Sequence, residues 1–225
     1  MAPYGRLLKE EALKLNPNPK LSAVLILLYP KSTKRPIKWK KFNGVNIEHS
    51  PASWRGKEHD SKGSASSIYT VLILRTSDHG VHSGQVSFPG GKKEESDRSL
   101  EDTALRETEE EIGIKKNDVK VIGHLSELYI PTSGFLVQPF VGYLNKKPLF
   151  HPDKNEVQKL IEVPLFLIMD DGIVKETTIL KSKTRNQKSE IRIPYFDIHG
   201  EVVWGATAMI LSELKEILVG VGIKG

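Results

Sequence analysis

The feature that most constrains this chain is a glycine-containing turn followed by a helix crowded with glutamates. Phe88-Pro89-Gly90-Gly91 precedes a helix predicted over Leu100–Ile112, which carries four glutamates within five residues. Ser99 is the expected N-cap, Asp102 follows it by three residues, and Gly113 is a C-terminal stop signal. Because both ends of the helix are marked, we expect residues 88–114 to fold as one loop–helix unit.

The glutamates occupy different positions around this helix. At about 100° per residue, the core-facing arc contains Leu100, Ala104, Leu105, Thr108 and Ile112. Glu107 and Glu111 border this arc, whereas Glu109 lies nearly opposite and is expected to be solvated. Like charges at these spacings repel, so their crowding favours a bound hard cation such as Mg²⁺. The alternative, a solvated charge run on an exposed face, does not explain the glycine turn and the closing Gly-Ile.

The segment from Gly91 to Ile114 resembles the Nudix box, G-x5-E-x7-R-E-U-x-E-E-x-G-U, where U is apolar. The second half matches from Arg106 onward, except that Thr108 stands at an apolar position. In the first half, Asp97 replaces the usual glutamate, and eight residues instead of seven separate it from Arg106. The resemblance implies an α/β protein with the Nudix fold, a mixed β-sheet sandwiched between α-helices, and hydrolysis of phosphoric anhydride bonds.

A second motif is similar to one found in the coenzyme A-type branch, the CoA pyrophosphatases. It is His82-Ser83-Gly84-Gln85-Val86-Ser87-Phe88-Pro89-Gly90-Gly91-Lys92, and the box offset is also that of this branch. The chain departs from compared members at Gly80, where Arg is frequent. The resemblance runs from about Leu21 to Trp204-Gly205-Ala206-Thr207-Ala208. It implies cleavage of coenzyme A or its derivatives to 3′,5′-ADP and (acyl-)4′-phosphopantetheine.

The resemblance also implies roles for the box residues. Glu107 and Glu111, with help from Glu110 and the Gly90 carbonyl, are expected to hold Mg²⁺ or Mn²⁺. A bound metal lowers the pKa of water and screens phosphate oxygens, so no covalent intermediate is required. Arg106 is expected to orient Glu107, while the alternative is a surface pair with Glu110.

The remaining candidates concern substrate and water. Substrate contacts are expected from Arg75, His82, Gln85, Gly91 and Lys92. A structural or solvated strand-end arginine is the alternative for Arg75, and a simple turn is the alternative for Gly90 and Gly91. Glu156 is a candidate for activating water, or an acid at a helix start. The histidines lack H-x-x-x-H spacing, and no G-x-S-x-G elbow occurs, so neither a histidine-based zinc site nor a serine hydrolase is expected.

The length of the chain indicates one globular domain, and its charge indicates an anionic partner. The 225 residues suffice for a single domain over 1–225. A net charge of +5 suits polyphosphate or nucleic acid, and the acidic helix favours a small nucleoside-diphosphate substrate. Cysteine is absent, which excludes disulfides and thiolate sites. Neither a signal peptide nor an apolar run of about 18 residues occurs, so we expect a cytoplasmic protein without a membrane span. The sequence leaves the oligomeric state open.

The remaining pattern predicts the other elements. A long segment, Pro30–Ser67, is either disordered or a functional flap, and Trp39 and Trp54 argue against complete disorder. A hairpin is expected from Thr177–Lys181 and Ile191–Asp197, with a basic loop over Lys181–Lys188. Other predicted elements are a helix at Arg6–Leu15, strands at Leu21–Tyr29, Ile68–Leu74, Val119–Leu125, Phe135–Leu144 and Glu201–Trp204, a short apolar helix after Pro164, and a closing helix at Ala206–Val219.

Two other functions are compatible with the sequence. One is a Nudix hydrolase of another nucleotide, such as ADP-ribose or a nucleoside triphosphate. The other is a basic Nudix-like module that binds nucleotides or RNA without catalysis. The intact set Glu107, Glu110 and Glu111 speaks against the second, because a binding module does not need it.

Overall fold

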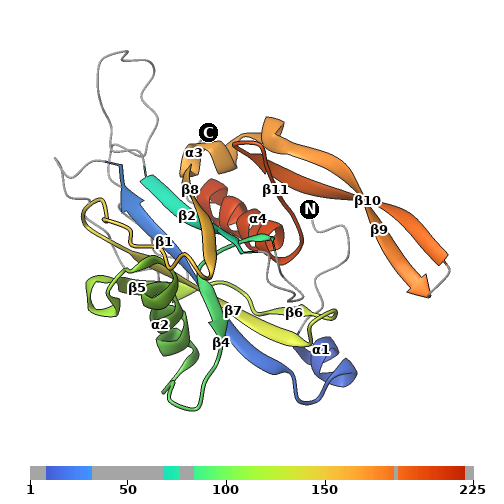
Figure 1. The fold of residues 1–225 in the computed structure, drawn as a ribbon, viewed down its shortest axis with the longest axis horizontal. Coiled ribbons are helices and arrows are strands. Elements are labelled where there is room, and N and C mark those ends of the chain that lie inside the picture. The colour runs from blue at the N-terminus through green and yellow to red at the C-terminus, as the bar shows by residue number, and fades with distance from the viewer. Residues whose placement is uncertain (1–8, 32–67, 77–83, 185–186, 221–225) are drawn as a thin grey trace.

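A computed structural model describes residues 9–31, 68–76, 84–184 and 187–220 (Figure 1). Most of the predicted flap Pro30–Ser67, with Trp39 and Trp54, lies outside the described residues, as do Gly80 and His82. The helices are α1 (Lys9–Leu15), α2 (Leu100–Ile112), α3 (Leu165–Met169) and α4 (Gly205–Gly220), with 3-10 turns η1 (Lys116–Asp118) and η2 (Asp171–Ile173). The strands are β1 (Lys20–Pro30), β2 (Ile68–Arg75), β3 (Val86–Ser87), β4 (Gly90–Lys92), β5 (Lys120–His124), β6 (Leu128–Ile130), β7 (Phe135–Tyr143), β8 (Val157–Pro164), β9 (Val174–Thr184), β10 (Gln187–Ile198) and β11 (Glu201–Val203).

The main sheet is mixed and centres on β1. Its strands run in the order β3-β2-β1-β7-β5, with β4 also paired to β1, β6 to β7 and β8 to β2. β1 runs parallel to β7 over nine residue pairs but antiparallel to β2 and β4. The apolar run of β1 is buried on both faces of the sheet, as its near-continuous hydrophobicity predicts.

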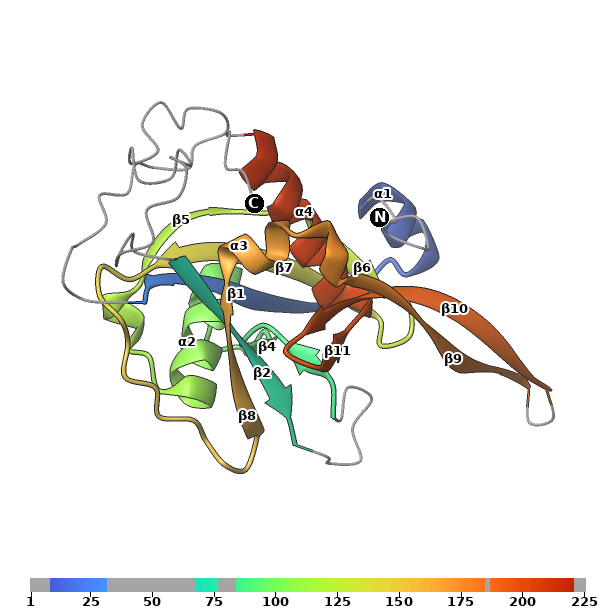
Figure 2. The same cartoon turned by 90° about the horizontal axis from the view of Figure 1, so that it is seen from above.

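Helices cover both faces of this sheet (Figure 2). Alternate residues of β1 point to opposite faces: Ala23, Leu25 and Leu27 belong to the core beside α2, whereas Ile26 and Leu28 belong to the core beside α3 and α4. The expected mixed sheet between helices is therefore confirmed. Within the described residues, no helix is long and apolar enough to cross a membrane.

The β9–β10 hairpin differs from the prediction in length. The expected basic loop over Lys181–Lys188 is wrong, because β9 extends to Thr184 and β10 starts at Gln187. The two strands pair along almost their whole length, and β11 completes a separate three-stranded sheet. Alternating Lys and Ser at the tip suits an extended strand as well as a loop. The hairpin projects away from the main sheet (Figures 1 and 2).

Candidate active site

Helix α2 begins and ends where the sequence predicts. The Ser99 side chain accepts a hydrogen bond from the Asp102 N–H at 3.1 Å, and Gly113 adopts φ 74° while its N–H donates to the Glu109 carbonyl. Thr108, at the position where the box has an apolar residue, is completely buried. Its hydroxyl donates to the Ala104 carbonyl at 2.7 Å, so the polar group is satisfied inside the core.

The glycine pair forms a short strand, so the alternative of a simple turn is wrong. Gly90 and Gly91 belong to β4 and pair with Val24 and Ala23 of β1. Gly90 has φ 151°, and a Cβ at this position would lie 2.3 Å from the Ala23 carbonyl oxygen. A Cβ on Gly91 would lie 2.4 Å from the Glu107 carboxylate. Gly90 therefore requires glycine, because it has a positive φ and the β1 backbone approaches it closely, whereas a side chain at Gly91 would displace the Glu107 carboxylate.

Glu111 is the most deeply buried of the glutamates. The residue is 1% exposed. Its carboxylate accepts hydrogen bonds from the Arg75 guanidinium at 2.6 Å and from the Gly90 N–H at 2.8 Å. Burial raises the pKa of Glu111 to about 7, against the opposing effects of Arg75 and the Gly90 amide. The helix thus directs a carboxylate into the core next to β4, further inside than its place beside the apolar arc predicts.

Arg106 is held by a cluster of acids. Its guanidinium donates two hydrogen bonds to Asp97, at 2.8 and 3.0 Å, and contacts Glu107 at 3.0 Å and Glu110 at 2.8 Å. It also donates to the Lys92 carbonyl at 3.2 Å. Hydrogen bonds from Arg106 hold the pKa of Asp97 well below its usual range. Both predicted pairings of Arg106 are present together, and Asp97 fixes the guanidinium between them.

Glu107 and Glu109 point into different surroundings. Burial raises the pKa of Glu107, and the Arg106 guanidinium opposes this shift. Glu109 accepts hydrogen bonds from the Lys115 ammonium at 2.7 Å and the Lys116 N–H at 2.9 Å. The Lys115 ammonium lowers the pKa of Glu109. Glu109 is thus hydrogen-bonded to the residues that follow α2, whereas Glu107 lies next to the glycine strand.

A cavity of about 680 Å³, here called the main cavity, brings together several of the predicted residues. Those that line it are Arg75, Gln85, Gly90, Gly91, Lys92 and Glu107. Arg106, Glu110, Glu111 and Glu156 are not among its lining residues. Glu111 lies behind Arg75 and Gly90, and exposed Glu156 lies 3.8 Å from the Arg75 guanidinium. The predicted contact His82 falls outside the described residues.

The sequence did not predict the apolar part of the lining of the main cavity. It includes Val24, Phe88, Phe135 and Val137 and the segment from Trp204 to Thr207. The Thr207 hydroxyl donates to the Val86 carbonyl at 2.9 Å, which ties the start of α4 to β3. The sequence does contain the Trp204-Gly205-Ala206-Thr207 motif, but only the fold brings it to the same cavity as Glu107.

The donor chemistry here fits a hard divalent cation. Glu107 and Glu111 carry oxygen ligands beside Gly90 and Gly91, and burial raises the pKa of both carboxyls, so a cation would stabilise their ionised forms. Among the described residues, no three His, Asp or Glu side chains are arranged to enclose a metal by themselves. Mg²⁺ is usually held by one or two carboxylates, water and substrate phosphates. The carboxylates of Glu107 and Glu111 are donors of this type.

Comparison with known proteins places the chain in a family. Residues 60–166 match the model of the NUDIX domain. Proteins named "uncharacterized Nudix hydrolase NudL" are 37% identical over 145 residues in Pectobacterium atrosepticum, covering 64% of this chain and 72% of that protein, and 36% identical over 148 residues in Yersinia enterocolitica, covering 65% and 73%. A crystal structure of a Nudix hydrolase from M. smegmatis, RenU, aligns over 92% of this chain and 89% of that one, with a TM-score of 0.51 and 12% identity, which supports the fold. The chain therefore belongs to the Nudix family of hydrolases, which act on phosphorus anhydride bonds.

Proposed function

We propose that this Nudix hydrolase cleaves the diphosphate of coenzyme A or its derivatives, giving 3′,5′-ADP and (acyl-)4′-phosphopantetheine. The main cavity carries the proposal. Its lining combines the charged side chains Arg75, Lys92 and Glu107 with apolar and aromatic residues. Its volume of about 680 Å³ lies within the range of roughly 300–1,000 Å³ for small-molecule sites. A diphosphate flanked by a nucleobase and a long uncharged arm needs both kinds of surface.

Nudix hydrolases generally use divalent cations, and the proposed ion here is Mg²⁺ or Mn²⁺. Glu107 and Glu111 would hold it, with Glu110 and the Gly90 carbonyl. When bound, the ion would offset charge on the diphosphate and lower the pKa of a coordinated water. Arg106 contacts Glu107 at 3.0 Å and is itself fixed by Asp97, so its proposed role is to orient the Glu107 carboxylate.

The proposed substrate contacts follow from the lining of the main cavity. Arg75 and Lys92 supply positive charge, and Gly91 lines the same cavity next to the Glu107 carboxylate. Gln85 and His82 complete the proposed set. Glu156 lies beside Arg75. We propose that its carboxylate accepts a proton from the attacking water, a role that glutamate side chains have as general bases.

A substrate screen tests the proposal. The full chain with Mg²⁺ is incubated with coenzyme A, ADP-ribose and nucleoside triphosphates, and products are separated by chromatography, with Glu107→Gln as the inactive control. We expect coenzyme A to have the highest kcat/KM and to release 3′,5′-ADP. A preference for ADP-ribose or a triphosphate would contradict the coenzyme A assignment. Binding without any cleavage would favour a non-catalytic module.

A further inference from the structure

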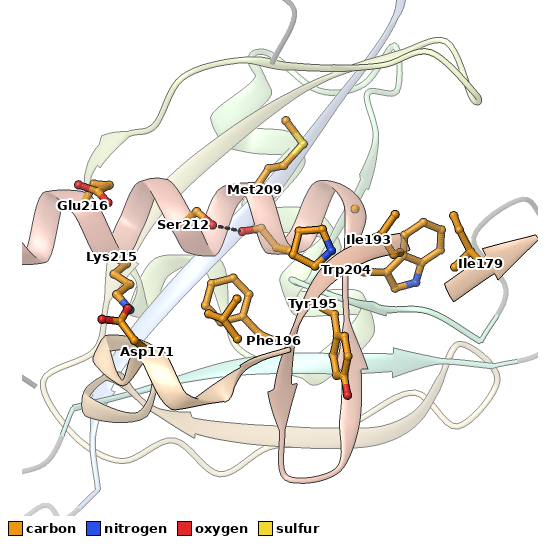
Figure 3. A pocket seen from close by; sticks show the side chains of 14 residues that line it. Asp171, Ile179, Ile193, Tyr195, Phe196, Trp204, Met209, Ser212, Lys215 and Glu216 are labelled. Carbon is orange, nitrogen blue, oxygen red and sulfur yellow. Dashed lines mark hydrogen bonds and ion pairs between the residues drawn. The ribbon is translucent and has the colours of Figure 1, made fainter. Parts of the chain in front are cut away.

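A second cavity of about 420 Å³ lies between the three-stranded sheet and helix α4 (Figure 3). It is here called the side cavity. Its walls are Val174, Ile179, Ile193, Pro194, Tyr195 and Phe196 from the sheet, and Trp204, Ala208 and Met209 from the chain entering and forming α4. Its size falls in the range of small-molecule sites, and its surface is largely aliphatic and aromatic.

The side cavity adjoins the main cavity. Trp204 and Gly205 line both. Gly205 has φ 62°, and a Cβ at this position would meet no atom within 4 Å, so the backbone is open at the junction. Beyond it the first turn of α4 divides its residues: Ala206 and Thr207 line the main cavity, whereas Ala208 and Met209 line the side cavity. The two cavities are therefore neighbours on either side of Trp204, Gly205 and the first turn of α4.

The charge of the side cavity disfavours a phosphate. Its cationic side chain is Lys215, whose ammonium is paired with the Asp171 carboxylate at 2.6 Å, and Glu216 adds a further negative charge to the lining. Figure 3 shows this pair at one end, away from Trp204, Ile179 and Ile193. Some apolar residues of the lining remain in contact with water: Val174 is 44% exposed and Met209 is only partly buried. Covering such surface with an aliphatic chain is favourable, and methionine adapts to irregular ligands.

We propose that the side cavity binds an aliphatic chain carried by the diphosphate substrate. This deepens the proposed function and rests on it: the diphosphate lies beside Glu107, and an acyl group on the far end of the substrate's uncharged arm passes Trp204 and enters between α4 and the sheet. The preferred substrate is then a medium-chain acyl derivative, and the side cavity, not the glutamate helix, sets that preference.

Binding without metal tests this independently of cleavage. Dissociation constants for coenzyme A and octanoyl-coenzyme A are measured by calorimetry in EDTA. We expect the octanoyl compound to bind on the order of tenfold more tightly, which corresponds to burying about two methylene groups. A carboxylate-terminated acyl chain of similar length should show no such gain. Equal affinity of the wild type for coenzyme A and its octanoyl derivative would overturn the proposal.

Substitutions on the two walls locate the effect. Ala208→Phe fills the side cavity from α4, and Ile179→Asp places a charge on the sheet wall; each should bring the affinity ratio to about one. Val219→Phe is the matched control, because Val219 lies on the same helix, 53% exposed and outside both cavities; its ratio should equal that of the wild type. If Ala208→Phe does not fold by circular dichroism, Ile179→Asp decides the matter.

Two results would assign the apolar surface differently. An unchanged tenfold ratio in both wall variants would overturn the proposal. If these variants also dissociate a wild-type dimer in sedimentation, the surface is a contact between two copies of the chain instead. Failure of cleavage in the substrate screen, with the octanoyl affinity ratio intact, would refute the diphosphatase assignment but not the aliphatic site.

Discussion

Glu107 and Glu111 lie one helical turn apart on α2, yet their carboxylates meet different partners. Glu111 is enclosed and bonded to Arg75 and the Gly90 amide, whereas Glu107 faces the main cavity beside Gly91. Both are largely removed from water, and burial raises the pKa of each. A pair of desolvated carboxylates is costly unless cations accompany them. Arg75 and Arg106 supply part of that charge, and the proposed metal would add to it.

The glutamates should differ sharply in their effect on turnover. Glu107→Gln and Glu111→Gln should each lower kcat by about 10²–10³-fold or more, because each removes a charge that would hold the metal in the transition state. Glu109→Gln should be nearly silent, since Glu109 is paired with Lys115 at the end of the helix. Steady-state kinetics with any cleaved diphosphate measures this, and near-wild-type activity in either of the first two variants would refute the metal assignment.

Asp97 should make stability depend on pH in a defined way. Its folded pKa lies below its unfolded one, so the stability it contributes is present above about pH 4 and is lost as the pH falls through the folded pKa. Asp97→Asn should cost about 2 kcal/mol at neutral pH, the scale of hydrogen bonds to a charged group. In urea unfolding, the difference between wild type and variant should shrink steadily below pH 4. A difference that stays constant down to pH 2.5 would contradict this.

At the scale of elements, β1 organises the site. It pairs with β4, which brings the glycine strand against Glu107, and its residues Ser22 and Val24 line the main cavity. If β1 slipped by one residue against β4, the side chains of β1 would turn to the opposite face of the sheet. Val24 would then no longer line the main cavity. The close contact between Gly90 and Ala23 therefore helps to set the register of β4 against β1, in addition to excluding a side chain at Gly90.

The segment between β1 and β2 should be dispensable for folding. Tyr29 pairs with Tyr69 and Pro30 with Ile68, so the two strand ends lie opposite each other and a short link can join them. Replacing residues 32–66 with a short Gly-Ser linker should change the thermal midpoint by only a few degrees, because loop length has a weak effect on closure entropy. A large loss of stability would mean that Trp39 and Trp54 pack into the core. Measuring cleavage by the same variant separates a functional role from a structural one.

At the scale of the whole molecule, the two cavities have complementary character. The lining of the main cavity mixes charged and apolar residues. The lining of the side cavity is mostly apolar, and its charged residues are the Lys215–Asp171 ion pair and Glu216. Both depend on the start of α4, where the three-stranded sheet meets the main sheet. The net charge of +5 favours approach of an anionic substrate to the molecule as a whole.

Recognition of the 3′-phosphate of coenzyme A should depend on one lysine. Arg75 is bonded to Glu111, and the Lys93 ammonium donates to the Asp97 carbonyl at 2.9 Å. Among the residues that the structure describes, this leaves Lys92 as the lysine that lines the main cavity. Coenzyme A should be cleaved roughly tenfold more efficiently than its 3′-dephospho form, the scale of a charge-assisted contact. Lys92→Met should abolish that ratio in kcat/KM, and Lys93→Met should preserve it. Equal kcat/KM of the wild type for both compounds would move the assignment to other nucleoside diphosphates.

The sequence by itself determined α2, its caps, the central strands and the family. These depend on local signals: a serine cap, a terminal glycine, helical periodicity and box spacing. It also placed Arg106 next to both Glu107 and Glu110, since residues one and four apart on a helix are neighbours.

The tertiary structure alone decided which residues surround the site. The contact between Arg75 and Glu111 joins positions 36 apart, and Trp204 reaches the main cavity from the far end of the chain. The pairing of Gly90 with β1 and the full length of the β9–β10 hairpin likewise depend on partners in other segments. The partner of a strand and the neighbours of a buried residue come from distant parts of the chain, so sequence periodicity does not identify them. Likewise, the desolvation that raises the pKa of Glu111 exists only after the core has formed.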